Sequence, residues 1–236
     1  MDLSVVIPVY NEEDNLRPLW QELREVLEGT GRTYEVIFVD DGSTDRSFSI
    51  LRELAQGDPH IRVLKFRKNC GQTAAFDAGF RAAKGEVVIT MDADLQNDPK
   101  DIPRLLEKIG EYDLVCGWRH RRQDPWLKRV SSRIANFVRN KVSGDYIRDT
   151  GCSLKAFRRE CVERLKLFEG MHRFFPTLAR MEGFRVVEIK VNHRPRLFGK
   201  TKYNIRNRAL RAFLDLLAVR WMKRRHLDYE VEEVLQ

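Results

Sequence analysis

The first 118 residues alternate between short apolar segments and segments with helical periodicity. The apolar segments, which we expect to be strands, span residues 3–7, 34–39, 61–66, 86–91 and 113–116. The segments with apolar side chains at helical spacing span residues 16–26, 47–54, 72–84 and 101–109. Near-continuous apolar strands separated by helices are typical of a parallel sheet that is buried on both faces. The sequence therefore predicts an α/β fold whose central sheet is mainly parallel and covered by helices.

The second half of the chain is less regular. We expect helices over 130–142 and 204–225, a strand over 184–191, and loops over 119–130 and 194–202. On a helical wheel, one broad face of the last helix is apolar, and its end carries Lys223, Arg224 and Arg225. Such a helix is able to lie in a membrane interface or to pack on the core, and the pattern leaves both open.

Charge is distributed unevenly along the chain. Residues 1–118 carry 14 basic and 22 acidic side chains, whereas residues 119–236 carry 29 basic and 13 acidic ones. This asymmetry suggests that the second half meets a polyanion or an anionic membrane, although a solvated basic surface fits the composition equally well. Because no motif that reads RNA or DNA accompanies it, we expect no nucleic-acid partner.

Three structural classes are disfavoured. The four cysteines form no Cys-x-x-Cys pair and no zinc-like spacing, so we expect reduced and mostly buried thiols. No apolar run approaches the roughly 18–20 residues that cross a bilayer, and the N-terminus lacks the features of a signal peptide. A cytosolic location is the expectation that follows.

Polar side chains follow the predicted strands at the points where they end. Ligands of open α/β sheets bind beyond the carboxyl ends of the strands. The residues in question are Pro8, Tyr10 and Glu12 after the first strand, Asp40 and Asp41 after the second, Asp92, Asp94 and Gln96 after the fourth, and Arg119 after the fifth. We therefore expect acidic groups and one basic group to meet at one edge of the sheet.

Asp92 and Asp94 are two residues apart, so in an extended segment their carboxylates lie on the same side. Two carboxylates this close repel unless a cation lies between them or one is protonated. Hard oxygen ligands suit Mg²⁺ or Mn²⁺, and Gln96 continues the spacing with an amide oxygen. We favour a metal site over a solvated turn. The absence of a G-x-G-x-x-G and of a Walker A motif disfavours a dinucleotide or P-loop site.

Seven motifs then occur in a fixed order. They are VVIPVYNEE at 5–13, VDDGSTD at 39–45, N-x-G-Q-T-A-A at 69–75, MDADLQ at 91–96, GWR at 117–119, DTGCSLKAFRR at 149–159 and FGKTKYN at 198–204. With them the chain resembles family 2 glycosyltransferases of the GT-A fold, in the dolichol-phosphate mannose synthase-like branch that acts on polyprenyl phosphates. The resemblance covers nearly the whole chain. We expect a catalytic domain over 1–203, with a nucleotide-sugar half (1–118) and an acceptor half (119–203), followed by a basic helix and an acidic tail over 204–236.

The resemblance also implies roles for individual residues. Pro8, Tyr10, Glu12, Asp40 and Asp92 would bind a UDP- or GDP-sugar, while Asp92, Asp94 and Gln96 would hold Mg²⁺ or Mn²⁺. Arg119 and Arg133 would bind donor or acceptor phosphates, and Lys202 and Tyr203 would meet the phosphates from the C-terminal loop. Asp149 matches an acidic position near the reacting sugar, where it acts as a base, positions other groups, or merely caps a helix that carries Leu154 and Phe157.

Two departures from the family bear on this expectation. Processive members carry Q-x-x-R-W, and here Leu217 stands where that glutamine would be, ahead of Arg220 and Trp221. This argues against a polysaccharide synthase with a membrane channel. Many relatives carry transmembrane helices after the KY motif, so we expect this chain to reach anionic lipid through residues 204–225, at the cytoplasmic face of a membrane.

The expected reaction is an inverting, metal-dependent transfer of a sugar from a UDP- or GDP-sugar to a polyprenyl phosphate. A hydroxyl acceptor would require a general base, whereas a phosphate acceptor is already ionised. Two alternatives are kept. One is a glycosyltransferase with another acceptor, such as a glycolipid, a saccharide or a protein. The other is a non-catalytic basic protein that binds membrane or nucleic acid, which leaves the acidic edge unexplained.

Overall fold

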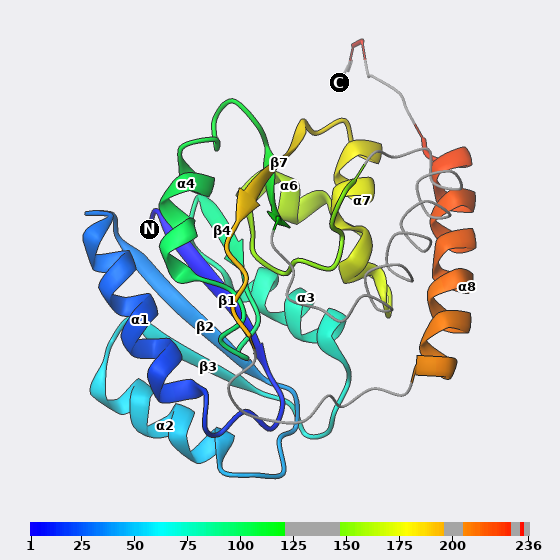
Figure 1. Ribbon diagram of the computed structural model, residues 1–236. Coiled ribbons are helices and arrows are strands. Elements are labelled where there is room, and N and C mark those ends of the chain that lie inside the picture. The colour runs from blue at the N-terminus through cyan, green and yellow to red at the C-terminus, as the bar shows by residue number, and fades with distance from the viewer. Residues whose placement is uncertain (121–146, 196–204, 228–231, 234–236) are drawn as a thin grey trace.

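The computed structural model describes residues 1–120, 147–195, 205–227 and 232–233, with the backbone alone at 205–212. Its centre is a seven-stranded sheet in the order β3-β2-β1-β4-β6-β5-β7 (Figure 1). The strands are β1 (Leu3–Val9), β2 (Tyr34–Asp40), β3 (Ile61–Lys65), β4 (Val87–Thr90), β5 (Leu114–Arg119), β6 (Lys155–Arg158) and β7 (Val186–Val191). All paired neighbours are parallel except at β6, which is antiparallel to both β4 and β5. The expected α/β fold with a mainly parallel sheet is confirmed.

Helices cover both faces of the sheet (Figure 1). The α-helices are α1 (Leu16–Gly29), α2 (Ser47–Gly57), α3 (Gln72–Ala82), α4 (Ile102–Leu106), α6 (Arg159–Arg164), α7 (Phe175–Met181) and α8 (Ile205–Arg224), and η1 (Pro99–Asp101) and η2 (Met171–Phe174) are single 3₁₀ turns. Side chains of successive strand residues point to opposite faces. In β1, Val5 and Ile7 accordingly join α1, α2 and α4 in one cluster, whereas Val6 joins α3, α6 and α7 in the other.

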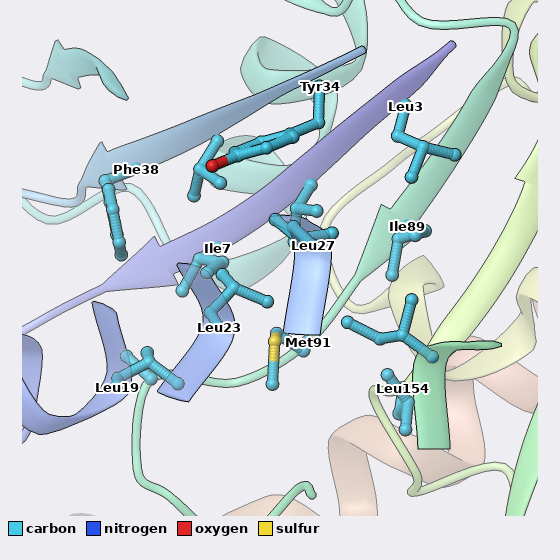
Figure 2. Packing of buried hydrophobic residues seen from close by; sticks show 14 of the residues in the cluster. Leu3, Ile7, Leu19, Leu23, Leu27, Tyr34, Phe38, Ile89, Met91 and Leu154 are labelled. Carbon is cyan, nitrogen blue, oxygen red and sulfur yellow. The ribbon is translucent and has the colours of Figure 1, made fainter. Parts of the chain in front are cut away.

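The first cluster is built on the apolar stripe of α1. Leu19, Leu23 and Leu27 lie at helical spacing and are fully buried against Ile7 and the neighbouring strand residues (Figure 2). The second cluster centres on aromatic rings. Phe157 and Phe175 meet edge to face with ring centroids 5.5 Å apart, and Phe80 lies within 5.7 Å of both. Each such ring pair adds about 0.5–1.5 kcal/mol to the free energy of area burial.

Helix α8 joins the second cluster through only part of its surface. Leu216 and Val219 are buried there, and Met222 is half-buried. Larger apolar side chains of the same helix point elsewhere. The exposed ones are Phe213, Leu214, Leu217 and Trp221. In Figure 1, α8 lies at the outer edge of the molecule, beyond α7. No helix in the described part of the chain is long and apolar enough to span a bilayer.

Several local expectations differ from the structure. Pro8 was expected to end the first strand but lies within β1. Its nitrogen faces the β4 side, where pairing has already ended at Val6 and Thr90, so no ladder hydrogen bond is lost. Gly85 was expected to stop the third helix, yet α3 ends at Ala82. A Cβ at Gly85 would lie 2.5 Å from the carbonyl carbon of Leu3, so close packing on β1 requires the glycine.

Two further expectations are wrong. Leu154 and Phe157 do not lie on a helix: Lys155–Arg158 is the strand β6, and α6 follows it. Of the four cysteines, which are all free, Cys70 is exposed and the other three are buried. The helix expected over 130–142 lies outside the described residues.

Candidate functional site

The carboxyl ends of β1, β2, β4 and β5 lie at the same edge of the sheet (Figure 1). β1, β2 and β4 pair in parallel, and β5 runs in the same direction because both it and β4 are antiparallel to β6. The loops after these four strands carry the residues that the sequence singled out. Their hydrogen bonds decide which of these side chains meet.

The loop after β1 is fastened to the loop after β2. Asn11 has a φ of 52°, which is uncommon for a residue other than glycine, and its backbone N–H donates to Oγ of Ser43 (2.9 Å). Its Oδ1 accepts from the backbone N–H of Thr44 (2.7 Å). The N–H of Glu12 donates to Oγ of Ser47 (2.9 Å). These bonds fix the two half-buried side chains that flank Asn11, Tyr10 and Glu12, beside the end of β2.

Asp40 and Asp41 are neighbours in sequence with different surroundings. Asp40 is completely buried; its Oδ1 accepts from the N–H of Ser43 (3.3 Å), and its Oδ2 has no hydrogen-bond partner among the described residues. A buried acceptor without a partner costs about 1–3 kcal/mol, so this oxygen is suited to a ligand donor. Asp41 is instead saturated by the segment 69–71. Burial raises the pKa of Asp41 in spite of those bonds.

The segment after β4 is a turn rather than an extension of the strand. β4 ends at Thr90, Leu95 has a φ of 62°, and the N–H of Gln96 donates back to Oδ1 of Asp94 (3.2 Å). The expected alternation of Asp92, Asp94 and Gln96 along an extended segment is therefore wrong. Both carboxylates still lie close enough for the charge of Asp94 to act on Asp92. Among the described residues, no third His, Cys, Asp or Glu completes a metal-binding cluster.

Asp92 is oriented by neutral donors. Nε2 of Gln72, the first residue of α3, donates to Oδ1 of Asp92 (2.8 Å). The N–H of Asp92 donates to Oδ1 of Asn97 (3.1 Å), which also accepts from Oγ of Ser153 (2.7 Å). Burial and the charge of Asp94 raise the pKa of Asp92 to about 6, against opposing contributions from Ser153, Lys155 and Arg119. A bound cation would relieve this repulsion between the two carboxylates.

Arg119 and Asp149 form a two-pronged ion pair next to these acids. Nε and Nη2 of Arg119 donate to Oδ2 and Oδ1 of Asp149 at 2.7 and 2.8 Å, and both side chains are largely buried. The backbone N–H groups of Arg119 and Gly151 donate to the same carboxylate. Burial opposes the charge of Arg119, but the bonds and charge of Asp149 outweigh it and raise the pKa of Arg119. A carboxylate with this many donors is better placed to orient an arginine than to accept a proton.

The sequence analysis missed residues that support this arrangement. Glu188 on β7 accepts from the N–H groups of Arg148 and Asp149 (3.0 Å each) and so fixes the approach to the ion pair. Lys155 is buried, and its ammonium donates to the carbonyl of Cys152. Nothing in the spacing of these residues signals their roles, because each depends on the pairing of β6 or β7. Asn97 and Ser153 were within quoted motifs or beside them but carried no assigned role.

The predicted site residues therefore fall into three groups. Pro8, Tyr10, Glu12 and Asp40 lie at the ends of β1 and β2; Asp92, Asp94 and Gln96 lie in the turn after β4; Arg119 and Asp149 form the ion pair. Gln72 and the charge interaction of Asp92 with Arg119 connect the second and third groups. Arg133, Lys202 and Tyr203 lie outside the described residues.

Comparison with known proteins identifies relatives of the whole chain. The model of glycosyl transferase family 2 matches residues 4–166. The dodecaprenyl-phosphate galacturonate synthase of Rhizobium johnstonii is 38% identical over 230 residues, which cover 95% of this chain and 68% of that protein. The undecaprenyl-phosphate 4-deoxy-4-formamido-L-arabinose transferase of Edwardsiella ictaluri is 43% identical over 206 residues, covering 86% and 63%. The chain thus spans about two thirds of the length of these relatives.

Solved structures share the fold at lower identity. The glucosyl-3-phosphoglycerate synthase of Mycobacterium tuberculosis, in complex with Mn²⁺, UDP and phosphoglyceric acid, superposes with a TM-score of 0.71 at 18% identity and covers 96% of this chain and 80% of its own. A mannosyltransferase of Pyrobaculum calidifontis in complex with GDP-Man and Mn²⁺ has a TM-score of 0.64 at 21% identity and covers 96% and 65%. At these identities the similarity supports the fold alone.

The buried ion pair allows a direct test of the site's construction. We expect Asp149→Asn to lower the free energy of unfolding by roughly 3 kcal/mol, because the buried Arg119 loses its charged partner. Glu163→Gln serves as control, since the ion pair of Glu163 with Arg159 is on the surface and contributes at most about 1 kcal/mol. Urea unfolding measures both. Equal small losses in the two variants would contradict the buried pairing.

Proposed function

The chain belongs to glycosyl transferase family 2, and from this premise we propose that it transfers a sugar from a UDP- or GDP-sugar to a polyprenyl phosphate. We further propose that transfer inverts the sugar's anomeric configuration and depends on Mg²⁺ or Mn²⁺. The observation that supports this most strongly is the grouping of buried acids at the sheet edge beside a buried arginine. Such an edge offers oxygen ligands for a cation and a guanidinium for a diphosphate.

The nucleoside would bind between the ends of β1 and β2. The unpartnered Oδ2 of Asp40 would accept a hydrogen bond from the base or the ribose, which removes the cost of its burial. Pro8 and Tyr10 would form an apolar wall there, and Glu12 is fixed close by through Asn15, whose Nδ2 donates to Oε2 of Glu12 (2.6 Å). Either base fits this description, so the donor class is decided by measurement.

The residues after β4 fit a divalent metal ion. Asp92 and Asp94 supply carboxylate oxygens, Gln96 supplies an amide oxygen, and the raised pKa of Asp92 reflects a negative charge that has no bound cation beside it. Two protein carboxylates leave coordination positions for the oxygens of a diphosphate. When bound, the metal would supply positive charge that stabilises the leaving diphosphate.

Arg119 would contribute positive charge next to the same diphosphate, and Asp149 would keep its guanidinium in place. An ionised phosphate acceptor attacks C1 of the sugar from the face opposite the diphosphate, so the C1–O bond to the donor breaks and the configuration inverts. Such an acceptor has no proton to remove. Asp149 is therefore a positioning residue in this proposal, which agrees with its four donors.

The polyprenyl phosphate acceptor is proposed from the names of the two relatives, both of which describe polyprenyl-phosphate products or acceptors. Arg133, Lys202 and Tyr203 remain predictions for its phosphate. Another acceptor, such as a glycolipid, saccharide or protein, would leave the donor half of the site unchanged.

The exposed side chains of α8 support a membrane contact. Phe213, Leu217 and Trp221 are spaced by one helical turn each and are 48%, 43% and 64% exposed. Lys223, Arg224 and Arg225 follow at the end of the helix and are exposed. An apolar stripe next to basic residues is typical of helices that lie in the interface of an anionic membrane. Because Leu216 and Val219 are buried in the core, α8 both packs on the domain and presents this stripe.

A thermal-shift experiment tests the donor site. We expect UDP or GDP, together with Mn²⁺, to raise the melting temperature, since binding to the folded state stabilises it by about 2.7 kcal/mol when the ligand is at a hundred times its Kd. Asp94→Asn should abolish the metal-dependent part of the shift. Asp77→Asn, which removes a surface ion pair with Arg81, should leave it intact. A shift that persists without metal, or in Asp94→Asn, would contradict the proposed metal site.

Sedimentation with vesicles tests the role of α8. We expect binding to mixed phosphatidylcholine and phosphatidylglycerol vesicles, and the double variant Leu217→Ser with Trp221→Ser should weaken it about tenfold or more, because burial of each large apolar side chain contributes about 1.5–3 kcal/mol. Ala218→Ser alters an exposed position on the same helix with little apolar area and should bind normally. Equal binding by both variants would rule out the stripe as the membrane contact.

A further inference from the structure

The segment N-x-G-Q-T-A-A at 69–75 is the one quoted motif to which no role has been assigned. In the structure it lies between the acids at the end of β2 and the acids after β4. We propose that Gln72 is a positioning residue: its side-chain amide holds Asp92 in the orientation in which that carboxylate binds the metal and the donor diphosphate. This inference rests on the proposed function and adds a residue to it.

The segment is anchored to β2 by a single carboxylate. Oδ1 of Asp41 accepts from the N–H of Cys70 (2.6 Å), and Oδ2 accepts from the N–H of Gly71 (2.9 Å) and from Nδ2 of Asn69 (3.0 Å). Three donors from consecutive residues bind one buried side chain, so the backbone leading into α3 is fixed relative to Asp40. Gly71 has a φ of 93°, a conformation that favours glycine, and this turns the chain into the helix.

The other side of the first helical turn is anchored as well. Oγ1 of Thr73 accepts from the N–H of Gly170 (3.0 Å) and lies 2.6 Å from Nδ1 of His172. Gln72 thus lies between two anchored residues. Its side chain reaches Asp92 from a backbone with little freedom to move, which is the requirement for a residue that orients another.

The chemistry of an amide suits this role. Nε2 of Gln72 occupies Oδ1 of Asp92 at 2.8 Å and leaves the second carboxylate oxygen for a metal ion. An amide adds no positive charge, so it does not compete with a cation for Asp92 as a lysine or arginine in its place would. The backbone bond to Asn97 fixes the other end of Asp92. Hydrogen-bonded partners of metal ligands commonly change metal affinity 10- to 100-fold when they are replaced.

Gln72→Met tests the inference, because methionine keeps the length and helix propensity of glutamine and removes the donor. The matched control is Gln56→Met, which alters an exposed glutamine of α2. We expect the Mn²⁺ concentration that gives half of the UDP- or GDP-dependent thermal shift to rise about tenfold in Gln72→Met. It should be unchanged in Gln56→Met, and the melting temperatures of both variants without ligand should stay close to that of the unmodified chain.

A double-mutant comparison separates positioning from a general effect on the fold. In an Asp92→Asn background, Gln72→Met should add little to the loss of Mn²⁺ affinity, because the group that Gln72 orients has been altered. Full additivity, or normal Mn²⁺ affinity in Gln72→Met, would overturn the inference while the response of the unmodified chain keeps the proposed function. A lack of any response in the unmodified chain would overturn both.

Discussion

Two like charges in a largely buried turn are the constraint around which the sheet edge is organised. Asp92 and Asp94 lie beyond β4, where burial and mutual repulsion raise the pKa of Asp92 to about 6. A fold that only had to be stable would replace such a pair with neutral groups. The surrounding residues instead orient the pair: Gln72 and Asn97 supply neutral hydrogen bonds, and Lys155 and Arg119 supply charge from a distance at which they make no printed contact with the carboxylates. The arrangement keeps negative charge available to a cation.

The cationic side of the edge is built in the opposite way. Arg119 is paired directly with Asp149, and Asp149 is fixed through backbone bonds to Gly151 and to Glu188. Burial makes the pairing strong and rigid, since leaving either charge alone would cost several kcal/mol. A fixed guanidinium beside loosely compensated carboxylates gives an edge with both signs of charge. That combination suits a metal-bridged diphosphate better than it suits a nucleic-acid backbone, which requires a broad cationic surface.

Much of the architecture was predictable, because buried parallel strands and amphipathic helices leave strong periodic patterns in the first 118 residues. β6 was missed since four residues form a strand only through their pairing with β4 and β5. The strand-like alternation expected at Asp92 and Asp94 failed because the chain turns at Leu95, a bulky residue at positive φ that gives no sequence signal. Arg119 and Asp149 were both named from the family resemblance, but their contact, 30 residues apart, depends on tertiary structure.

The central claim is that this edge binds a metal and a nucleotide sugar and passes the sugar to an ionised phosphate. The most direct measurement is incubation of the full chain with UDP- and GDP-sugars, Mn²⁺ and a short polyprenyl phosphate, followed by mass spectrometry and NMR of the product. The account predicts a polyprenyl-phosphate sugar whose anomeric configuration is opposite to that of the donor, formed only with metal. A product that retains the donor configuration, or transfer that proceeds without divalent metal, would contradict it.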